Sequence, residues 1–249
     1  MTRILLLGGT TEASAMATAL HAAGVQAVFS YAGRTAAPVT QPLPTRIGGF
    51  GGAEGMAHYI RANGISHVID ATHPFAAQIS RNTIDACEAT QVPLIVLQRA
   101  AWVAGAQDHW VHVADTLAAV AALPEAPARV FLAIGKQTLE PFAFKPQHHY
   151  LLRLVDAPEG PLPLPDCAFV IARGPFTEAG DTALMTQHGI THIVAKNAGG
   201  TGAQAKLAAA RARQLPVILI ERPALPPRQI VHEVTQVMDW LHQSARLGV

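Results

Sequence analysis

The glycine-rich segment 8–13 (GGTTEA) follows a short apolar run and precedes a helical pattern. Glycine lets the backbone approach a phosphate closely, and N–H groups at the start of a helix attract an anion. The segment departs from the GxGxxG fingerprint, because Thr10 and Ala13 replace its second and third glycines. The alternative is a tight turn in which Thr10 or Thr11 caps the helix. The candidate cofactor-binding residues of this segment are Gly9, Thr10, Thr11 and Glu12.

Polar residues at the end of the next apolar run favour a cofactor that carries an extra phosphate. NAD sites usually place a carboxylate there for the ribose hydroxyls. This chain instead has Ser30, Tyr31, Arg34 and Thr35. A guanidinium binds phosphate through two parallel hydrogen bonds, so we predict NADPH rather than NADH as the cofactor. The alternative is that Arg34 is an ordinary solvated loop residue. Further along the chain, Arg46 adds another positive charge.

The elements that position these residues occur twice in the chain. Similar segments recur in the same order, with similar flanking residues as well as similar apolar cores. The pairs are 3–6 (RILL) with 129–132 (RVFL), 64–69 (GISHVI) with 189–194 (GITHIV), and 91–99 (QVPLIVLQR) with 214–222 (QLPVILIER). We infer an internal duplication.

Short apolar runs alternate with helical patterns in both halves, which is typical of parallel strands covered by helices on both faces. Strands are expected near 3–7, 25–31, 67–71, 93–97, 129–134, 149–155, 167–172, 191–195 and 216–220. Helices are expected near 11–23, 53–63, 75–90, 114–123, 177–188, 202–213 and 229–243.

This alternation predicts an α/β fold of two similar Rossmann-like, doubly wound parallel-sheet lobes. The proline-rich join near residue 124 divides the chain into an NADPH-binding lobe, 1–124, and a substrate-binding lobe, 125–249. Ligands of such sheets bind outside the carboxyl ends of the strands. We therefore expect the two lobes to face each other across a cleft lined by these ends.

The composition excludes several classes of protein. Charged residues make up only 14% of the chain and the formal net charge is +1, which argues against disorder and against wholesale binding of nucleic acid or membrane. Cys87 and Cys167 lie far apart, so we expect buried thiols and no metal site. No apolar run approaches the roughly 18 residues that span a bilayer, and the first residues are too short for a signal peptide. A cytoplasmic protein is expected.

Five segments together resemble a known family. They are 7–13 (LGGTTEA), 30–34 (SYAGR), 70–76 (DATHPFA), 174–176 (GPF) and 196–201 (KNAGGT). Their order and the length of the chain resemble the precorrin-6A reductase family of cobalamin biosynthesis from end to end. The resemblance implies NADPH-dependent reduction of one double bond of the tetrapyrrole precorrin-6A, giving precorrin-6B. It implies no flavin or metal, and it leaves the cobalt-containing substrate of the anaerobic route as an alternative.

The substrate that the resemblance implies carries many carboxylates, and the second half of the chain has cations at predicted strand ends. Such cations can bind carboxylates through charged hydrogen bonds, although most surface lysines and arginines are simply solvated. The glycine-rich loop after Lys196 opens a helix and can hold an anion through its backbone. The candidate substrate-binding residues are Lys136, Arg173, Lys196, Asn197, Gly199 and Thr201.

His73 is the candidate catalytic residue. It follows a strand and precedes Pro74, so it belongs at the ligand-binding edge of the sheet, where Thr72 is expected to contact the cofactor. The His73 ring can hold the cofactor or substrate, or deliver the proton that must accompany a hydride. The alternative is a hydrogen-bonded cap at the start of a helix. Water is another source of the proton.

Two other classes of function share the predicted two-lobed α/β architecture or the NADP site. Epimerases and ketoreductases on short α/β scaffolds use a Tyr-x-x-x-Lys pair, and none of the three tyrosines here has a lysine four positions later. The second alternative function is that of a non-catalytic, two-lobed protein that senses NADP(H). Consumption of NADPH would distinguish an enzyme from a sensor.

Overall fold

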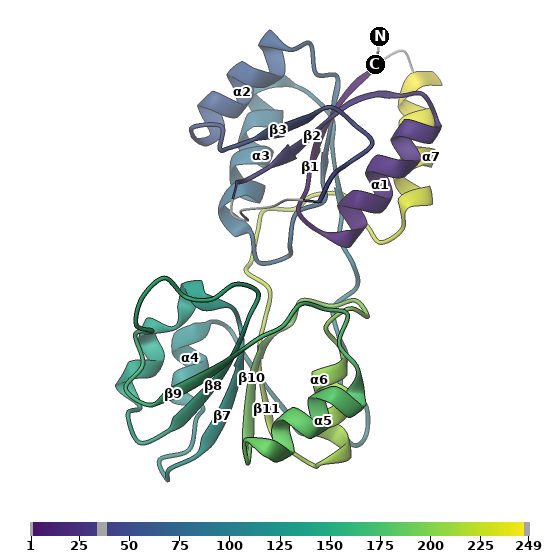
Figure 1. The fold of residues 1–249 in the computed structure, drawn as a ribbon. Helices are drawn as coiled ribbons and strands as arrows, with labels where there is room; N and C mark the ends of the chain where they lie inside the picture. The colour runs from purple at the N-terminus through teal and green to yellow at the C-terminus, as the bar shows by residue number, and fades with distance from the viewer. Residues whose placement is uncertain (1, 34–38, 247–249) are drawn as a thin grey trace. The chain divides into compact units, whose positions relative to one another are not determined.

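The computed structural model describes residues 2–33 and 39–246 of the chain. Within these residues twelve strands form two sheets of six, and every strand pairing is parallel (Figure 1). The expected α/β fold with two Rossmann-like parallel sheets is confirmed.

The first sheet has the strand order β12-β5-β4-β1-β2-β3. Its strands are β1 (Arg3–Leu7), β2 (Gln26–Tyr31), β3 (Thr45–Ile47), β4 (His67–Asp70), β5 (Leu94–Leu97) and β12 (Ile230–Val231). Alternate residues of β1 point to opposite faces, and both faces are covered. Ile4 and Leu6 pack with α1 (Thr11–Ala22) and α7 (Val234–Arg246), whereas Leu5 and Leu7 pack with α2 (Gly52–Ala62) and α3 (Ala77–Thr90) (Figure 1).

The second sheet has the equivalent order β6-β11-β10-β7-β8-β9. Its strands are β6 (Trp110–Val113), β7 (Arg129–Ala133), β8 (His149–Leu154), β9 (Cys167–Ile171), β10 (His192–Lys196) and β11 (Val217–Ile220). Helices α5 (Glu178–Gln187) and α6 (Ala205–Ala212) cover one face, and α4 (Thr116–Ala121) lies on the other (Figure 1). Two short 3₁₀ turns, η1 (Lys136–Thr138) and η2 (Glu140–Phe144), follow β7.

All nine strands expected from the apolar runs are present, with ends that differ by at most one residue. Three strands were not expected: β3, β6 and β12. Each lies at the edge of a sheet and is short or partly exposed, so it lacks the continuous apolar run of a central strand. The predicted helix 229–243 was wrong at its start, because residues 230–231 pair with β5 and α7 begins only at Val234.

The division of the chain differs from the expected cut at residue 124. One compact unit contains Met1–Ala100 together with Ala224–Val249, and the other contains Ala101–Pro223. The segment after β5 supplies β6 and α4 to the second sheet, where β6 pairs with β11. The segment after β11 supplies β12 and α7 to the first sheet, where β12 pairs with β5. Each repeat therefore completes the other repeat's sheet.

Backbone hydrogen bonds align the carboxyl ends of the central strands in the first sheet. The Gly8 N–H donates to the Ser30 carbonyl at 3.0 Å, and the Ala71 N–H donates to the Leu7 carbonyl at 3.0 Å. The loops that follow β1, β2 and β4 consequently leave the sheet side by side. This edge carries most of the residues that the sequence singled out as cofactor contacts.

Candidate active site

Two glycines give the loop after β1 its shape. A Cβ atom on Gly8 would lie 2.0 Å from the Phe29 ring, so a side chain at this position would collide with the core. Gly9 has a φ of +122°, and a Cβ atom there would meet nothing within 4 Å. The backbone at Gly9 is thus exposed beside open space at the start of α1, which suits the close approach of a phosphate.

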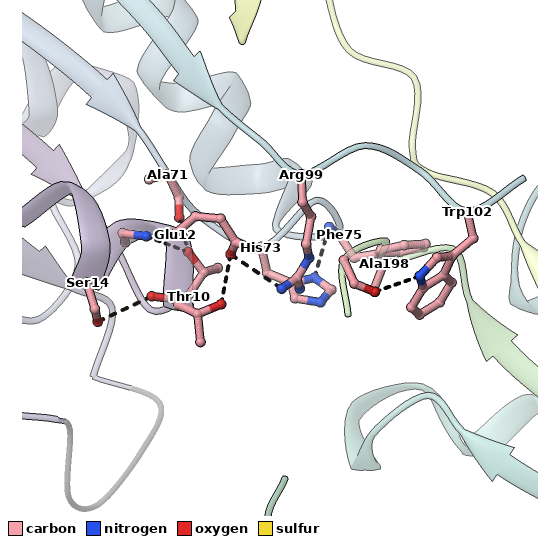
Figure 2. Close-up of polar contacts among 12 residues, drawn as sticks. Thr10, Glu12, Ser14, Ala71, His73, Phe75, Arg99, Trp102 and Ala198 are labelled. Atoms are coloured by element: carbon pink, nitrogen blue, oxygen red, sulfur yellow. Dashed lines mark hydrogen bonds and ion pairs between the residues drawn. The ribbon is translucent and has the colours of Figure 1, made fainter. Parts of the chain in front are cut away.

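Thr10 is the N-cap of α1. Its Oγ1 accepts a hydrogen bond from the Ala13 N–H at 3.1 Å and donates one to the Ala71 carbonyl at 2.7 Å (Figure 2). The interpretation of Thr10 as a helix cap is confirmed. The same hydroxyl joins the loop after β1 to the loop after β4, so it aligns the N–H groups of the first turn of α1.

Glu12 lies in the first turn of α1 and forms an ion pair with Arg99, with 3.4 Å between Oε2 and Nη1 (Figure 2). The Thr11 hydroxyl donates to the same Oε2 at 3.2 Å. Arg99 follows β5 and approaches α1 from the other side of the β4 loop. Its positive charge offsets a carboxylate that would otherwise repel a phosphate at this helix terminus.

Ser30 and Tyr31, at the end of β2, have different roles in the structure. Ser30 is buried, and its Oγ accepts a hydrogen bond from Arg46 Nη1 at 2.8 Å. The Tyr31 hydroxyl donates to the Val39 carbonyl at 2.7 Å and accepts from Gln41 Nε2 at 2.6 Å, so it fixes the chain that follows. The predicted phosphate contacts Arg34 and Thr35 lie outside the described residues.

The loop after β4 is held by the buried carboxylate of Asp70. Its Oδ1 accepts hydrogen bonds from the Thr72 N–H at 3.0 Å and the Thr72 hydroxyl at 2.7 Å, and its Oδ2 accepts from the Ser80 hydroxyl at 2.6 Å. These bonds fix the start of the loop that carries His73.

The His73 ring receives a hydrogen bond from the backbone. The Phe75 N–H donates to Nδ1 at 3.2 Å (Figure 2). The bond therefore orients the His73 ring on the loop after β4.

In the second unit, the loop after β10 contains predicted substrate-binding residues, and one of them has a structural role. Lys196 ends β10 and is half-buried, and burial lowers the pKa of its ammonium group. Asn197 is buried, with Oδ1 accepting from the Trp102 N–H at 2.8 Å and Nδ2 donating to the Trp102 carbonyl at 3.3 Å. The indole N–H of Trp102 donates to the Gly200 carbonyl at 2.8 Å. These contacts show a structural use of the Asn197 amide, which fixes the glycine-rich loop.

The remaining predicted substrate contacts lie on neighbouring loops of the same unit. Lys136 begins η1 after β7 and is exposed, and the exposed Arg173, after β9, pairs with Asp156 at 2.8 Å. Gly199 is buried with a φ of +72°, whereas Thr201 is exposed. All four follow the carboxyl ends of strands in one sheet, as expected.

Two residues that shape these loops had no predicted role: Arg99 and Arg222. Arg222 follows β11 and donates to the carbonyls of Asn197 at 3.0 Å and Ala198 at 3.2 Å. Arg99 and Arg222 occupy matching positions in the repeated segments 91–99 and 214–222. That match was the available signal, since an arginine retained in both repeats follows a strand each time.

Comparison with known proteins places this arrangement in a family. The family model described as precorrin-6x reductase CbiJ/CobK matches residues 3–242. The chain is 66% identical to a precorrin-6A reductase of Rhodobacter capsulatus over the whole of both chains. It is 46% identical to one from Rhodococcus erythropolis, over 97% of this chain and 98% of the relative.

The chain belongs to the precorrin-6x reductase family. The resemblance inferred from the five motifs is thus confirmed. A solved structure titled CobK precorrin-6A reductase superposes with a TM-score of 0.93 at 65% identity, covering 98% of this chain and 97% of that one. Relatives named cobalt-precorrin-6A reductase are more distant, such as that of Priestia megaterium, at 32% identity over 98% of this chain and 99% of the relative. Across the described residues, no helix is long and apolar enough to cross a membrane.

Proposed function

We propose that this protein is a precorrin-6A reductase of cobalamin biosynthesis that uses NADPH to form precorrin-6B. The observation that carries the proposal is 66% identity, over the full length of both chains, to a protein named precorrin-6A reductase. The reaction adds a hydride from the nicotinamide and a proton across one double bond of the macrocycle. A cytoplasmic location is part of the proposal.

The metal-free substrate is favoured over the cobalt-containing one. The relatives named precorrin-6A reductase are 40% to 66% identical to this chain, whereas those named cobalt-precorrin-6A reductase are 26% to 32% identical.

The first unit fits NADPH. Its residues would hold the pyrophosphate at the open backbone of Gly9 and the first turn of α1, where Thr10 fixes the geometry. The proposed further contacts are Thr11, Glu12, Ser30, Tyr31, Arg34, Thr35 and Thr72. NADPH would supply the hydride, and the protein would supply orientation and charge.

The second unit is proposed to hold the substrate. Its carboxylates would bind the cations that follow strand ends, Lys136, Arg173 and Lys196, with the backbone near Gly199 and the Thr201 hydroxyl as further donors. Asn197 would act through the loop that it fixes to Trp102. Burial of Lys196 makes its charge more effective, because screening by water is weaker there.

His73 remains the proposed catalytic residue, as a hydrogen-bond donor to the bound reactants. The Phe75 N–H bond to Nδ1 helps to hold the orientation of the ring. The proton that accompanies the hydride would come from the His73 ring or from water. The expected effect of His73→Gln is a loss of kcat of about 10- to 100-fold, with binding of NADP⁺ preserved.

The decisive assay mixes the purified protein with precorrin-6A and NADPH deuterated on the nicotinamide ring. The proposal expects loss of NADPH absorbance and a product that carries one deuterium from the cofactor. A protein that binds NADPH but consumes none with any tetrapyrrole is a sensor and not this enzyme. Faster turnover of cobalt-precorrin-6A than of precorrin-6A would assign it to the anaerobic route.

A further inference from the structure

Arg46 lies on β3 directly beside Ser30 on β2, and its guanidinium group is held from several sides. The parallel pairing of the two strands places Ser30 opposite Arg46. Arg46 Nη1 donates to the Ser30 hydroxyl at 2.8 Å and to the Gly48 carbonyl at 3.0 Å, and Nη2 donates to the Gly49 carbonyl at 3.0 Å. The guanidinium is thus fixed by three hydrogen bonds before any ligand is present.

Aromatic rings support the same group. The guanidinium carbon of Arg46 lies 3.8 Å from the centre of the Phe50 ring and 5.1 Å from that of the Tyr59 ring. Phe50 and Tyr59 meet edge to face, with 5.3 Å between their ring centres. Stacking against aromatic faces restricts the guanidinium and leaves its edge available for hydrogen bonds.

The charge of Arg46 is not neutralised by a carboxylate within residues 2–33 and 39–246. None of the ion pairs found there includes Arg46, and its hydrogen-bond acceptors there are a hydroxyl and two carbonyls, all uncharged. A half-buried, immobilised guanidinium with neutral partners retains the capacity to bind an anion.

The position of Arg46 identifies which anion this would be. In Rossmann-type sheets, the adenine ribose lies at the carboxyl end of the second strand, and an arginine there accommodates the 2′-phosphate of NADP. Ser30 is near that end of β2, and Arg46 reaches it from the neighbouring strand. We propose that Arg46 binds the 2′-phosphate of NADPH and, with the Ser30 hydroxyl that it positions, sets the preference for NADPH over NADH. This inference rests on the proposed use of NADPH.

Binding of NADP⁺ and NAD⁺ to the full-length protein, measured by calorimetry, tests the inference without relying on turnover. Arg46→Gln is expected to weaken NADP⁺ at least about tenfold and to change NAD⁺ less than about twofold, because only NADP⁺ carries the phosphate. The matched control is Arg61→Gln, which removes an exposed arginine that donates to the Ala89 carbonyl on the same unit. It should leave both affinities unchanged.

Arg46→Lys keeps the charge but not the planar group with its several donors, and it is the decisive variant if Arg46→Gln does not fold. It is expected to weaken NADP⁺ several-fold with little effect on NAD⁺. An unchanged ratio of the two affinities, or an equal loss of both, in whichever variant folds would overturn the role of Arg46. A wild-type protein that shows no preference for NADP⁺ would instead refute the proposed cofactor itself.

Discussion

At the scale of single residues, buried polar groups determine where the loops of the first sheet begin. Asp70 is 2% exposed and ends β4, and its carboxylate accepts three hydrogen bonds from Thr72 and Ser80. An aspartate after a strand in a dinucleotide-type fold suggests a ligand contact. Here the structure uses it to fix the loop that carries His73.

Replacing Asp70 by asparagine should destabilise the protein by about 1–3 kcal/mol, because an amide N–H₂ would face donors that now bond to a carboxylate oxygen. Urea unfolding monitored by circular dichroism measures the change. Asp85→Asn, on the exposed face of α3, removes the same charge and should cost less than about 0.5 kcal/mol. Equal effects of the two substitutions would show that the Asp70 hydrogen bonds contribute nothing.

Buried histidines make the stability of the fold depend on pH. His148 is fully buried and its Nδ1 accepts a hydrogen bond from the Ala128 N–H at 3.1 Å. Burial, and then the nearby positive charge of Lys145, lower the pKa of this ring below its ordinary value of 6.5. Burial also lowers the pKa of His67 and of His192.

A histidine whose pKa is lower in the folded state stays neutral there while the unfolded chain takes up a proton. Its contribution to stability is therefore full above pH about 6.5 and is lost as the pH falls below that value. We expect the free energy of unfolding to decrease between pH about 7 and 5. His148→Asn should reduce this slope, and His58→Asn, at an exposed position on α2, should not. A slope that is the same in both variants would argue against His148.

At the scale of elements, the start of α1 combines a structural cap with a proposed ligand site. The Thr10 hydroxyl binds the Ala13 N–H and the Ala71 carbonyl, so one group both begins a helix and joins two loops. This arrangement leaves the backbone, rather than the threonine side chain, as the part that would meet the phosphate of the proposed cofactor.

Thr10→Ala should therefore destabilise the protein by about 1–2 kcal/mol, through loss of the cap and of the bond to the β4 loop. Thr10→Ser should restore most of the stability, since serine keeps the hydroxyl. Thermal melts compare the two with Thr11→Ala, whose hydroxyl is exposed and bonds to Glu12. If Thr11→Ala costs as much as Thr10→Ala, the capping argument is wrong.

At the scale of the whole molecule, each sheet is completed by a segment from the other repeat. Helix α7, at the carboxyl end of the chain, buries Val237 and Leu241 against α1 in the first unit. Helix α4, from the middle of the chain, belongs to the second unit with β6. The position of a segment along the sequence therefore does not show which sheet it packs against.

Val237→Ala should destabilise the first unit by about 2 kcal/mol, because it leaves a cavity at a fully buried position. Hydrogen exchange followed by mass spectrometry should show faster exchange in peptides from β1 and α1 than in those from α5 and α6. Leu207→Ala, on α6, should give the reverse. Faster exchange confined to residues 125–223 in Val237→Ala would support a simple division at residue 124.

The candidate site was predictable from sequence where its residues follow a strand in a motif. Gly9, Thr10, Thr72 and Lys196 all lie at the carboxyl ends of strands, as the apolar runs indicated. The burial of Asn197 against Trp102 was not predictable, because it depends on a contact between residues far apart in the chain. The bond between Ser30 and Arg46 depends likewise on β3, a three-residue edge strand with no apolar run.

The sequence by itself determined the alternation of strands and helices, the duplication and the membership of the family, since these follow from local burial patterns and from motifs. Only the tertiary structure decided which segment completes which sheet. Strands β5 and β11, each next to the edge strand of its sheet, come from similar repeats and offer similar backbone hydrogen-bonding groups, so no local pattern specifies whether β6 or β12 pairs with each. That choice is made by packing between segments more than a hundred residues apart, as in the burial of Val237 beside α1.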